Sequence, residues 1–200
     1  MAYKFLRLFF LISVVCFVGI GCGLLRPRAV IPPHNKAGTR LIAVLLVNNK
    51  AGDEKAAQAL RNKVLYALYF KGYPKISFDV IDEKLSKAYP ENIDSKREDI
   101  SSQAVGKLLN IDAVMYCTLK ECRTSFSYFR ASTVISADFE LKNAKTGETL
   151  WRAQQRTVKR SFGFSRKDLE MESAQVYEPA IQEIINKALK TLPDGPDSPG

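Results

Sequence analysis

Residues 129–141 read FRASTVISADFEL, and the alternation in this stretch decides the fold class. From Phe129 to Leu141 every second residue is apolar or small, while polar residues occupy the positions between them, apart from Val134. Successive side chains of a strand point to opposite faces, so the pattern predicts a long strand with one buried face and one face in water. Such half-buried strands are typical of antiparallel sheets.

The segments around this strand extend the sheet. Residues 143–148 (NAKTGE) form a predicted hairpin turn that leads into a partner strand over 150–159. Upstream, residues 112–119 form a further strand, and the unbroken apolar run 41–47 (LIAVLLV) predicts a strand that is buried on both faces. Alternation at 76–80 adds a shorter strand with one polar face.

Apolar residues at helical spacing predict helices at 53–71, 82–89, 101–110 and 166–192. Asp53 is the expected N-cap of the first helix, and Ser101 or Ser102 is expected to cap the third. Pro179 is expected in the first turn of a second segment within the last helix.

Together these elements predict one α/β (α+β) domain over 39–192, with a mixed, largely antiparallel sheet flanked by helices. A disordered tail is expected over 193–200. The whole chain has a net charge of +9, which favours anionic partners. Nucleic acid is not expected among them, because the sequence has no basic helix, zinc-ligand spacing or aromatic RNA-binding signature.

The amino terminus predicts export and lipid attachment. A basic start at Lys4 and Arg7, followed by an apolar run over 8–20, is typical of a signal peptide, which would span 1–21. The small residues that lead into Cys22 resemble the lipobox of bacterial lipoproteins, in which the cysteine becomes the acylated amino terminus. An ordinary signal peptide and a signal anchor are the alternatives.

The lipobox resemblance also implies a location. Cys22 would carry palmitate and related acyl chains, and each buried methylene contributes about 0.8 kcal/mol of membrane affinity. In such lipoproteins an Asp after the cysteine commonly directs retention at the inner membrane. Gly23 therefore implies the outer membrane, with the domain facing the periplasm and surface exposure as the alternative. Residues 22–38, which are rich in proline, would form a tether that reaches up to about 50 Å.

Cys117 and Cys122 are the cysteines expected within the domain. On one straight strand they would face opposite sides and lie about 16 Å apart, too far for a disulfide. A disulfide would require a turn at Lys120-Glu121, and two unpaired thiols are the alternative. No metal site and no cofactor are expected, because no histidine lies near these cysteines.

The sequence offers little support for catalysis. His34 is the only histidine, and it lies in the predicted tether. Nucleophile-elbow, phosphate-loop and dinucleotide-binding motifs are missing. Carboxylate pairs occur at Asp79 with Asp82 and at Glu170 with Glu172, and such pairs are more often surface charge than acid–base groups. We therefore expect no enzymatic activity.

Two groups of residues are candidates for binding a partner. Phe126, Tyr128 and Arg130 combine aromatic rings with a guanidinium, as interface anchors often do. The alternative is a local cluster that a helix or loop covers. Arg152 and Arg156 lie on one face of the predicted strand 150–159, together with Gln154 and Arg160. They could dock an acidic protein or cell-wall polymer, or they could simply be solvated.

Three segments carry a resemblance to a known family: 40–49 (RLIAVLLVNN), 106–116 (GKLLNIDAVMY) and 145–151 (KTGETLW). They resemble a group of Gram-negative lipoproteins of unassigned function. The soluble domain of that group is similar to the amino-terminal domain of TolB, to CsgG and to LpoB, so a TolB-like fold is implied over most of 39–192. CsgG-like relatives form pores, but Arg130, Asp138 and Glu140 on the outer face argue against a membrane-inserted hairpin here.

The resemblance implies a role in envelope assembly, secretion or transport. We expect a non-catalytic outer-membrane lipoprotein that binds other envelope proteins, among them a CsgG-like lipoprotein, with peptidoglycan as a further partner. Activation of a peptidoglycan synthase, as the similarity to LpoB implies, is one alternative, and a surface hydrolase is another. A homodimer formed through a sheet edge or the aromatic group is also compatible with the sequence.

Overall fold

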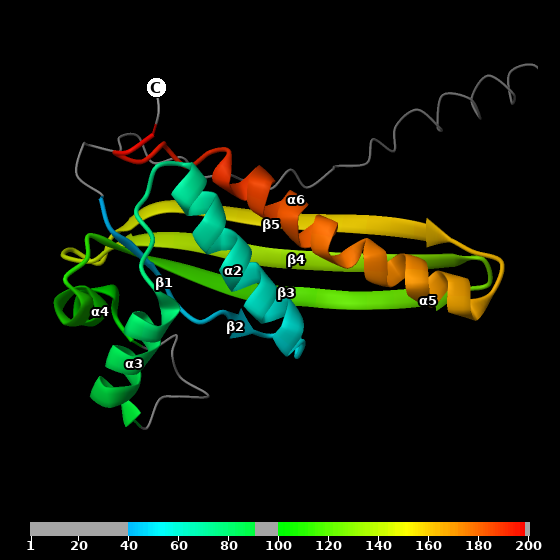
Figure 1. Ribbon diagram of the computed structural model, residues 1–200, viewed down its shortest axis with the longest axis horizontal. Helices are drawn as coiled ribbons and strands as arrows, with labels where there is room; N and C mark the ends of the chain where they lie inside the picture. The colour runs from blue at the N-terminus through cyan, green and yellow to red at the C-terminus, as the bar shows by residue number, and fades with distance from the viewer. Residues whose placement is uncertain (1–39, 91–99, 199–200) are drawn as a thin grey trace, which may run out of the picture.

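The computed structural model describes residues 40–90 and 100–198, and Figure 1 shows the arrangement of their elements. The strands are β1 (Ile42–Val44), β2 (Asn48–Asn49), β3 (Ala113–Ser127), β4 (Arg130–Asn143) and β5 (Thr149–Phe162). The helices are α2 (Glu54–Phe70), α3 (Phe78–Ala88), α4 (Ser102–Leu109), α5 (Arg166–Gln175) and α6 (Tyr177–Leu189). The predicted signal peptide, Cys22, the tether and His34 lie outside the described residues.

One mixed sheet runs through the domain. Its order is β1-β3-β4-β5, and β2 also pairs with β3. β1 and β2 run parallel to β3, whereas β3 with β4 and β4 with β5 are antiparallel. The predicted fold class, a mixed and largely antiparallel sheet flanked by helices, is therefore confirmed.

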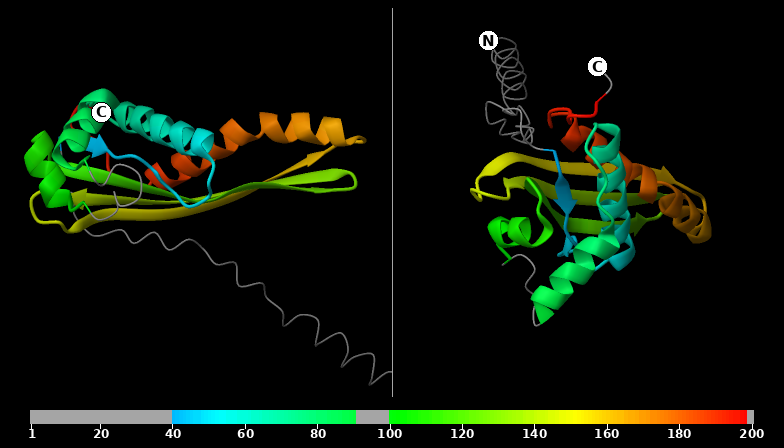
Figure 2. Two further views of the ribbon diagram at one scale, coloured as in Figure 1. Left: turned by 90° about the horizontal axis from the view of Figure 1, so that it is seen from below. Right: turned by 60° about the vertical axis from the view of Figure 1, so that its left-hand side comes forward.

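Helices lie on both faces of this sheet (Figure 2). α2, α5 and α6 cover one face, while α3 and α4 pack against the other face at the β1 end. In β1, Ile42 and Val44 join the apolar cluster under α2 and α6, whereas Ala43 and Leu45 join the cluster under α3 and α4. β1 is thus buried on both faces, as predicted, but the strand ends at Val44, before the end of the apolar run 41–47, and Leu46 is exposed.

The predicted helix starts agree with the structure at three points. The Asp53 carboxylate accepts a hydrogen bond from the Ala56 amide at 2.9 Å and so caps α2. The Ser101 hydroxyl caps α4 in the same way, accepting from the Ala104 amide at 3.2 Å. α6 begins two residues before Pro179, which places this proline in the first turn.

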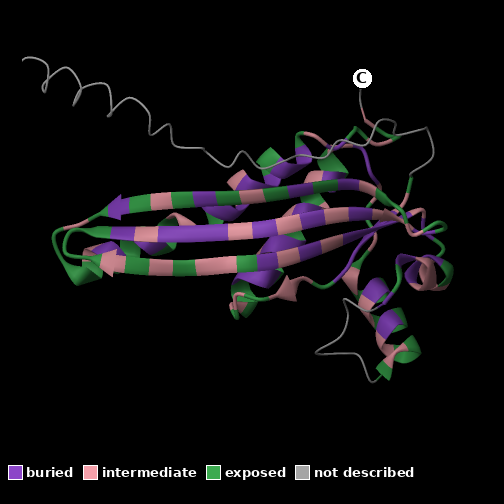
Figure 3. Cartoon of the chain, turned by 180° about the vertical axis from the view of Figure 1, so that it is seen from behind, coloured by how far each residue is buried: buried purple, intermediate pink, exposed green. Residues whose placement is uncertain are grey.

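β3, β4 and β5 extend beyond α3 and α4 as a long three-stranded ribbon with one covered and one uncovered face. Ile135, Ala137 and Phe139 of β4 are fully buried on the face covered by the helices. Figure 3 shows the opposite face, turned away from α2, α5 and α6, which we call the open face. At the far end of the ribbon, the β3–β4 turn lies beside the connection from β5 to α5 (Figure 1).

A β-bulge at Lys120 changes the faces of β3. The pairing of β3 with β4 shifts register between Leu119 and Glu121. One extra residue turns all following side chains to the other face of a strand. Cys117 and Cys122 therefore both lie on the covered face, and the expectation of opposite faces is wrong. Both are free thiols on one continuous strand, without the turn that a disulfide would need.

The strand predicted at 76–80 is wrong, because Phe78 begins the helix α3. Ile81 and Leu85 follow Phe78 at helical spacing, and both are buried. Phe78 itself lies under the guanidinium of Arg61, with 4.0 Å between the guanidinium carbon and the ring centre. This helical period outweighs the short alternation that suggested a strand.

Phe129 does not belong to the core, although its register in the stretch 129–141 predicted a buried position. Ser127, the last residue of β3, pairs with Arg130, the first residue of β4, so Tyr128 and Phe129 form the turn between the two strands. The alternation therefore extends one residue too far, because the chain must reverse direction before β4 begins.

The sequence predicted a disordered tail over 193–200. In the structure, residues of this segment contact the end of α2. The amide of Gly195 donates to the carbonyl of Lys71 at 2.6 Å, and the Tyr73 hydroxyl donates to the carbonyl of Pro193 at 3.0 Å. Residues 195–198 lie against Gly72, whose backbone φ is positive.

Within 40–90 and 100–198, no helix is both long and apolar enough to cross a bilayer.

Candidate functional site

The open face near β1 carries a balanced set of charges. Glu140 accepts hydrogen bonds from Arg152 at 2.8 Å and from Thr149 at 2.7 Å, and Lys142 lies 3.7 Å away. Burial alone would raise the pKa of Glu140, but the hydrogen bonds from Thr149 and Arg152 and the charge of Lys142 lower it below its usual value. Arg152, a predicted docking residue, is thus paired within the sheet.

Arg156, the second predicted docking residue of β5, also faces a carboxylate. Its Nε lies 3.5 Å from Glu121 of β3. Between these two pairs, Asp138 accepts a hydrogen bond from Gln154 at 3.2 Å and forms an ion pair with Lys120. The half of the open face nearest β1 is therefore close to neutral, and the predicted docking strip is largely occupied by partners from the same sheet.

The other half of the open face is cationic. The pairing register places three rows of side chains across β3, β4 and β5: Arg123–Val134–Val158, Ser125–Ser132–Arg160 and Ser127–Arg130–Phe162. Beyond Glu121 and Ser136, these described strands carry no carboxylate. Arg123, Arg130 and Arg160 are all exposed, so their positive charge stays uncompensated within the ribbon.

Exposed aromatic side chains gather at the far end of the ribbon, which we call the tip: Tyr128, Phe129, Phe162 and Phe164. Their exposed fractions are 94%, 64%, 72% and 96%. The amide of Gly163 donates to the carbonyl of Phe129 at 3.2 Å, which joins the β3–β4 turn to the end of β5. The tip thus gathers four exposed aromatic residues beside the cationic half of the open face.

The structure separates Phe126 from the other predicted binding residues. After the bulge at Lys120, Phe126 points to the covered face, where the guanidinium of Arg166 in α5 lies 3.9 Å from its ring centre. Phe126 thus fits the alternative of a local cluster covered by a helix. Tyr128 lies in the tip and Arg130 on the cationic half, so these two stay together.

Sequence reasoning missed Phe162 and Phe164 as exposed aromatic residues. It also did not place Arg160 beside them. The predicted β5 ended at residue 159, whereas the strand continues to Phe162. The hairpin turn at 143–148 alone would have placed Ser161 opposite Arg130. The register of β4 and β5 shifts by one residue between Leu141 and Lys142, and this shift brings Phe162 opposite Arg130.

A cavity of about 600 Å³ opens at the β1 end of the open face, and its lining includes Asn49, Tyr116, Glu140 and Lys142. The Tyr116 hydroxyl donates to the carbonyl of Ile100 at 3.0 Å. Burial, with a smaller effect of the Glu140 charge, raises the pKa of Tyr116 to about 12. Tyr116 therefore keeps its proton at neutral pH and offers a hydrogen-bonding group rather than a base.

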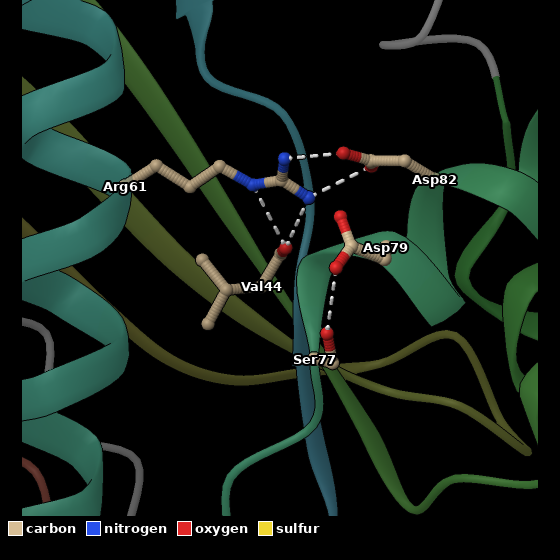
Figure 4. A network of polar contacts seen from close by, with 5 residues as sticks. All are labelled: Val44, Arg61, Ser77, Asp79 and Asp82. Carbon is tan, nitrogen blue, oxygen red and sulfur yellow. Dashed lines mark hydrogen bonds and ion pairs between the residues drawn. The ribbon is translucent and has the colours of Figure 1, made fainter.

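The predicted carboxylate pair Asp79 and Asp82 is split between two roles (Figure 4). Asp82 binds the guanidinium of Arg61 through both carboxylate oxygens, at 2.7 and 2.9 Å. Asp79 lies 3.5 Å from the Ser77 hydroxyl. Arg61 also donates to the carbonyl of Val44, so this network joins α2, β1 and α3. Asp82 is thus part of a structural contact.

Three polar groups meet between β3, α2 and α6. The Tyr177 hydroxyl donates to Asp53 at 2.5 Å and accepts from the Cys122 thiol. The hydrogen bond from Tyr177 lowers the pKa of Asp53, while burial raises the pKa of Cys122. Burial also raises the pKa of Cys117, to about 12. Both thiols are therefore held in the protonated form, which is not nucleophilic.

Two further features complete the surface. A groove of about 600 Å³ between α2 and α6 is lined in part by Tyr66, Phe70, Lys63 and Lys190. In the part of the chain that the structure describes, no cluster of three or more His, Cys, Asp or Glu residues could hold a metal ion.

Comparisons with known proteins agree with the fold. The family model described as "Putative lipoprotein GNA1162-like" matches residues 33–194. The lipoprotein GNA1162 from Neisseria meningitidis is 21% identical, with 68% of this chain and 94% of that chain covered and a TM-score of 0.54. The PelC dodecamer from Paraburkholderia phytofirmans is 16% identical, with 88% and 99% covered and a TM-score of 0.52.

The carboxyl-terminal domain of LpoB from Salmonella enterica is a more distant structural neighbour. It is 16% identical, covers 61% of this chain and 84% of its own, and has a TM-score of 0.42. No curated protein matches the chain significantly.

Proposed function

The chain belongs to the GNA1162-like family of lipoproteins, and from this membership we propose that it is a lipid-anchored, non-catalytic binding module of the Gram-negative cell envelope. Cys22 is the proposed acylated residue, the outer membrane is its proposed location, and the domain faces the periplasm. Its role is to hold other envelope proteins together within an assembly, secretion or transport system.

The observation that carries this proposal is the contrast between the surface and the interior. The surface presents an aromatic tip and a cationic half of the open face, and both have the composition of binding surfaces. The interior groups that could do chemistry have other tasks: Asp82 binds Arg61, Asp53 caps α2, and the Cys122 thiol is protonated. Binding is therefore the function that this arrangement supports best.

The edges of the sheet support self-assembly as part of that role. Among the described residues, β5 pairs with β4 alone, and β3 beyond Leu119 also pairs with β4 alone. Unpaired edges on opposite sides of a ribbon allow head-to-tail contacts between copies of the chain. Such contacts close into a ring when the rotation from one copy to the next divides a full turn evenly. The structural neighbour PelC is a dodecamer. We therefore favour a ring of copies over the homodimer.

The test combines a chemical and an assembly measurement on the full chain in cells. Intact-mass analysis should show a chain that begins at an acylated Cys22, and a Cys22→Ser variant should lose the acyl mass. Crosslinking in intact cells should then capture copies of the chain and envelope proteins on one complex. A chain with an unmodified Cys22, or one that crosslinks to nothing, would overturn the proposal. A peptidoglycan pull-down would separate a wall-linked role from a transport role.

A further inference from the structure

We infer that the tip of the ribbon lies on an anionic lipid surface, where its aromatic rings enter the headgroup layer and the neighbouring arginines bind lipid phosphates. The rings are those of Tyr128, Phe129, Phe162 and Phe164, and the arginines are Arg123, Arg130 and Arg160. The inference deepens the proposed function, because it gives the domain a contact with the bilayer besides the acyl chains.

The aromatic rings favour an interfacial position. Tyr128 and Phe164 are almost fully exposed, and the hydrogen bond from Gly163 to Phe129 keeps the two turns side by side. Exposed apolar side chains that gather at one end of a domain mark a contact surface. Aromatic rings that stand beside basic side chains are typical of segments that lie in the headgroup layer of a membrane. The short turns suit contact with that layer rather than a span across it.

The charges favour an anionic surface. Arginines in the half of the open face near β1 face carboxylates, as Arg152 faces Glu140 and Arg156 faces Glu121. Near the tip the same residue type has no such partner within the ribbon. Guanidinium groups bind phosphate oxygens in a bidentate geometry, so three exposed arginines around an aromatic surface complement phospholipid headgroups.

The charged groups of α5 do not reverse this balance. Arg166 and Lys167 begin the helix, and Arg166 pairs with Glu170 at 2.8 Å. The carboxylate of Asp168 accepts from the Ser165 amide at 3.1 Å in a capping box, so it is engaged at the helix start. The two basic and two acidic side chains of residues 166–170 therefore balance, and the positive charge beside the tip is that of the open face.

The proposed tether is long enough for the anchor and the tip to share one bilayer. Ala113 pairs with Ile42 near the start of the described chain, and β3 runs from there to the tip over at most about 48 Å. The chain from Cys22 to Arg40 spans at most about 60 Å when it is extended. This step rests on the proposed acylation of Cys22, whereas the aromatic and charge arguments do not.

A tryptophan introduced at the tip tests the inference. The chain has a single tryptophan, Trp151, which is buried and donates to Thr191, so it lies away from the tip. A Phe164→Trp variant of the full acylated chain would be reconstituted into vesicles of phosphatidylethanolamine and phosphatidylglycerol with brominated acyl chains. We expect bromine to quench the introduced indole and to leave the fluorescence of the unsubstituted chain unchanged.

The charge part has a matched control on the same face. Arg130→Gln with Arg160→Gln should reduce quenching of the introduced indole, with each arginine contributing about fivefold to the equilibrium between the bound and free tip. Arg152→Gln with Arg156→Gln removes the same charge near β1 and should leave quenching intact. Equal effects of the two pairs, or equal quenching in purely zwitterionic vesicles, would overturn the role of the arginines.

An unquenched indole at position 164 would overturn the inference as a whole, including the case in which a protein partner or a second copy covers the tip. That result leaves the anchor to be judged separately, because the mass of Cys22 is measured on the same sample. An acylated Cys22 with an unquenched tip refutes only the membrane contact. An unmodified Cys22 refutes the proposed function, and added vesicles then test the tip without an anchor.

Discussion

Arg61 and Asp82 form the one bidentate contact that joins α2 to α3 in the described structure, with nitrogen–oxygen distances of 2.7 and 2.9 Å (Figure 4). The Arg61 side chain is only 7% exposed, and it also donates to the carbonyl of Val44 at the end of β1. A charge this deeply buried needs its counterion, because the partner replaces the water lost on folding. The pair therefore fixes α3 on the sheet.

Removing this guanidinium should destabilise the domain strongly. Arg61→Ala leaves the carbonyl of Val44 without its donor and Asp82 without its counterion, so we expect a loss of about 3 kcal/mol in the free energy of unfolding. Urea denaturation followed by circular dichroism measures it. Lys87→Ala removes the exposed ion pair with Glu83 on α3 and should cost less than about 0.5 kcal/mol. Similar losses for the two variants would contradict the structural role of Arg61.

Glu183 should make stability depend on pH under acidic conditions. Hydrogen bonds from Lys159 and Lys187 lower its pKa from 4.5 to about 2. Because the folded pKa is the lower one, this contribution is complete above pH 4.5 and is lost as the pH falls towards 2. Glu183→Gln should therefore lower stability at neutral pH and flatten its fall across this acidic range.

Thermal unfolding between pH 2 and 7 checks the effect of Glu183. Glu178→Gln is the matched control, since it makes the same change on α6 at a side chain that is 75% exposed. A pH profile of Glu183→Gln that runs parallel to that of the unsubstituted chain would rule out a contribution from this carboxylate.

The fold class followed from the sequence because its signals are local. The alternation in 129–141 and the turn at 143–148 predict β4, β5 and their antiparallel pairing without reference to any other segment, although the register shifts by one residue between Leu141 and Lys142. The bulge at Lys120 has no such signal, since an extra residue looks like any other until its partner strand is placed. It turns all later β3 side chains to the other face, so that Phe126 lies on the face covered by the helices.

The candidate site was only partly predictable for the same reason. Tyr128 and Arg130 lie at the start of a strong strand pattern, so the sequence could identify them as candidate binding residues. Phe162 and Phe164 come to the tip only because β5 pairs with β4 to its end, opposite Arg130. The neutralisation of Arg152 and Arg156 depends on carboxylates from two other strands, which no spacing along β5 reveals.

The two thiols of β3 should be free and slow to react. Burial raises the pKa of Cys117 to about 12 and also raises that of Cys122, so little thiolate is present at pH 8. We expect both to resist a thiol reagent in the folded chain, Cys122 less than the fully buried Cys117, and both to react at once in urea. After unfolding without reductant, mass analysis of the β3 peptides should show Cys117 and Cys122 alkylated, whereas a disulfide between them would leave both unlabelled.

Substitution of Gly106 by alanine should destabilise the domain, although Gly106 lies inside a helix. A Cβ added there would come within 2.6 Å of both the Cβ and the carbonyl oxygen of Ala144, in the turn between β4 and β5. Alanine gains about 1 kcal/mol in helix propensity over glycine. That gain is smaller than the cost of forcing α4 away from a turn whose backbone cannot yield, because the Ala144 amide donates to the Asp112 carbonyl at 2.9 Å.

We therefore expect Gly106→Ala to lose about 2 kcal/mol in the free energy of unfolding, measured by urea denaturation. Lys107→Ala, at the next and exposed position of α4, should change stability by less than about 0.5 kcal/mol. The segments 106–116 and 145–151 both carried the family resemblance, and the close approach of Gly106 to Ala144 brings the first of them against the turn that leads into the second. A stabilising Gly106→Ala would show that α4 does not lie against this turn.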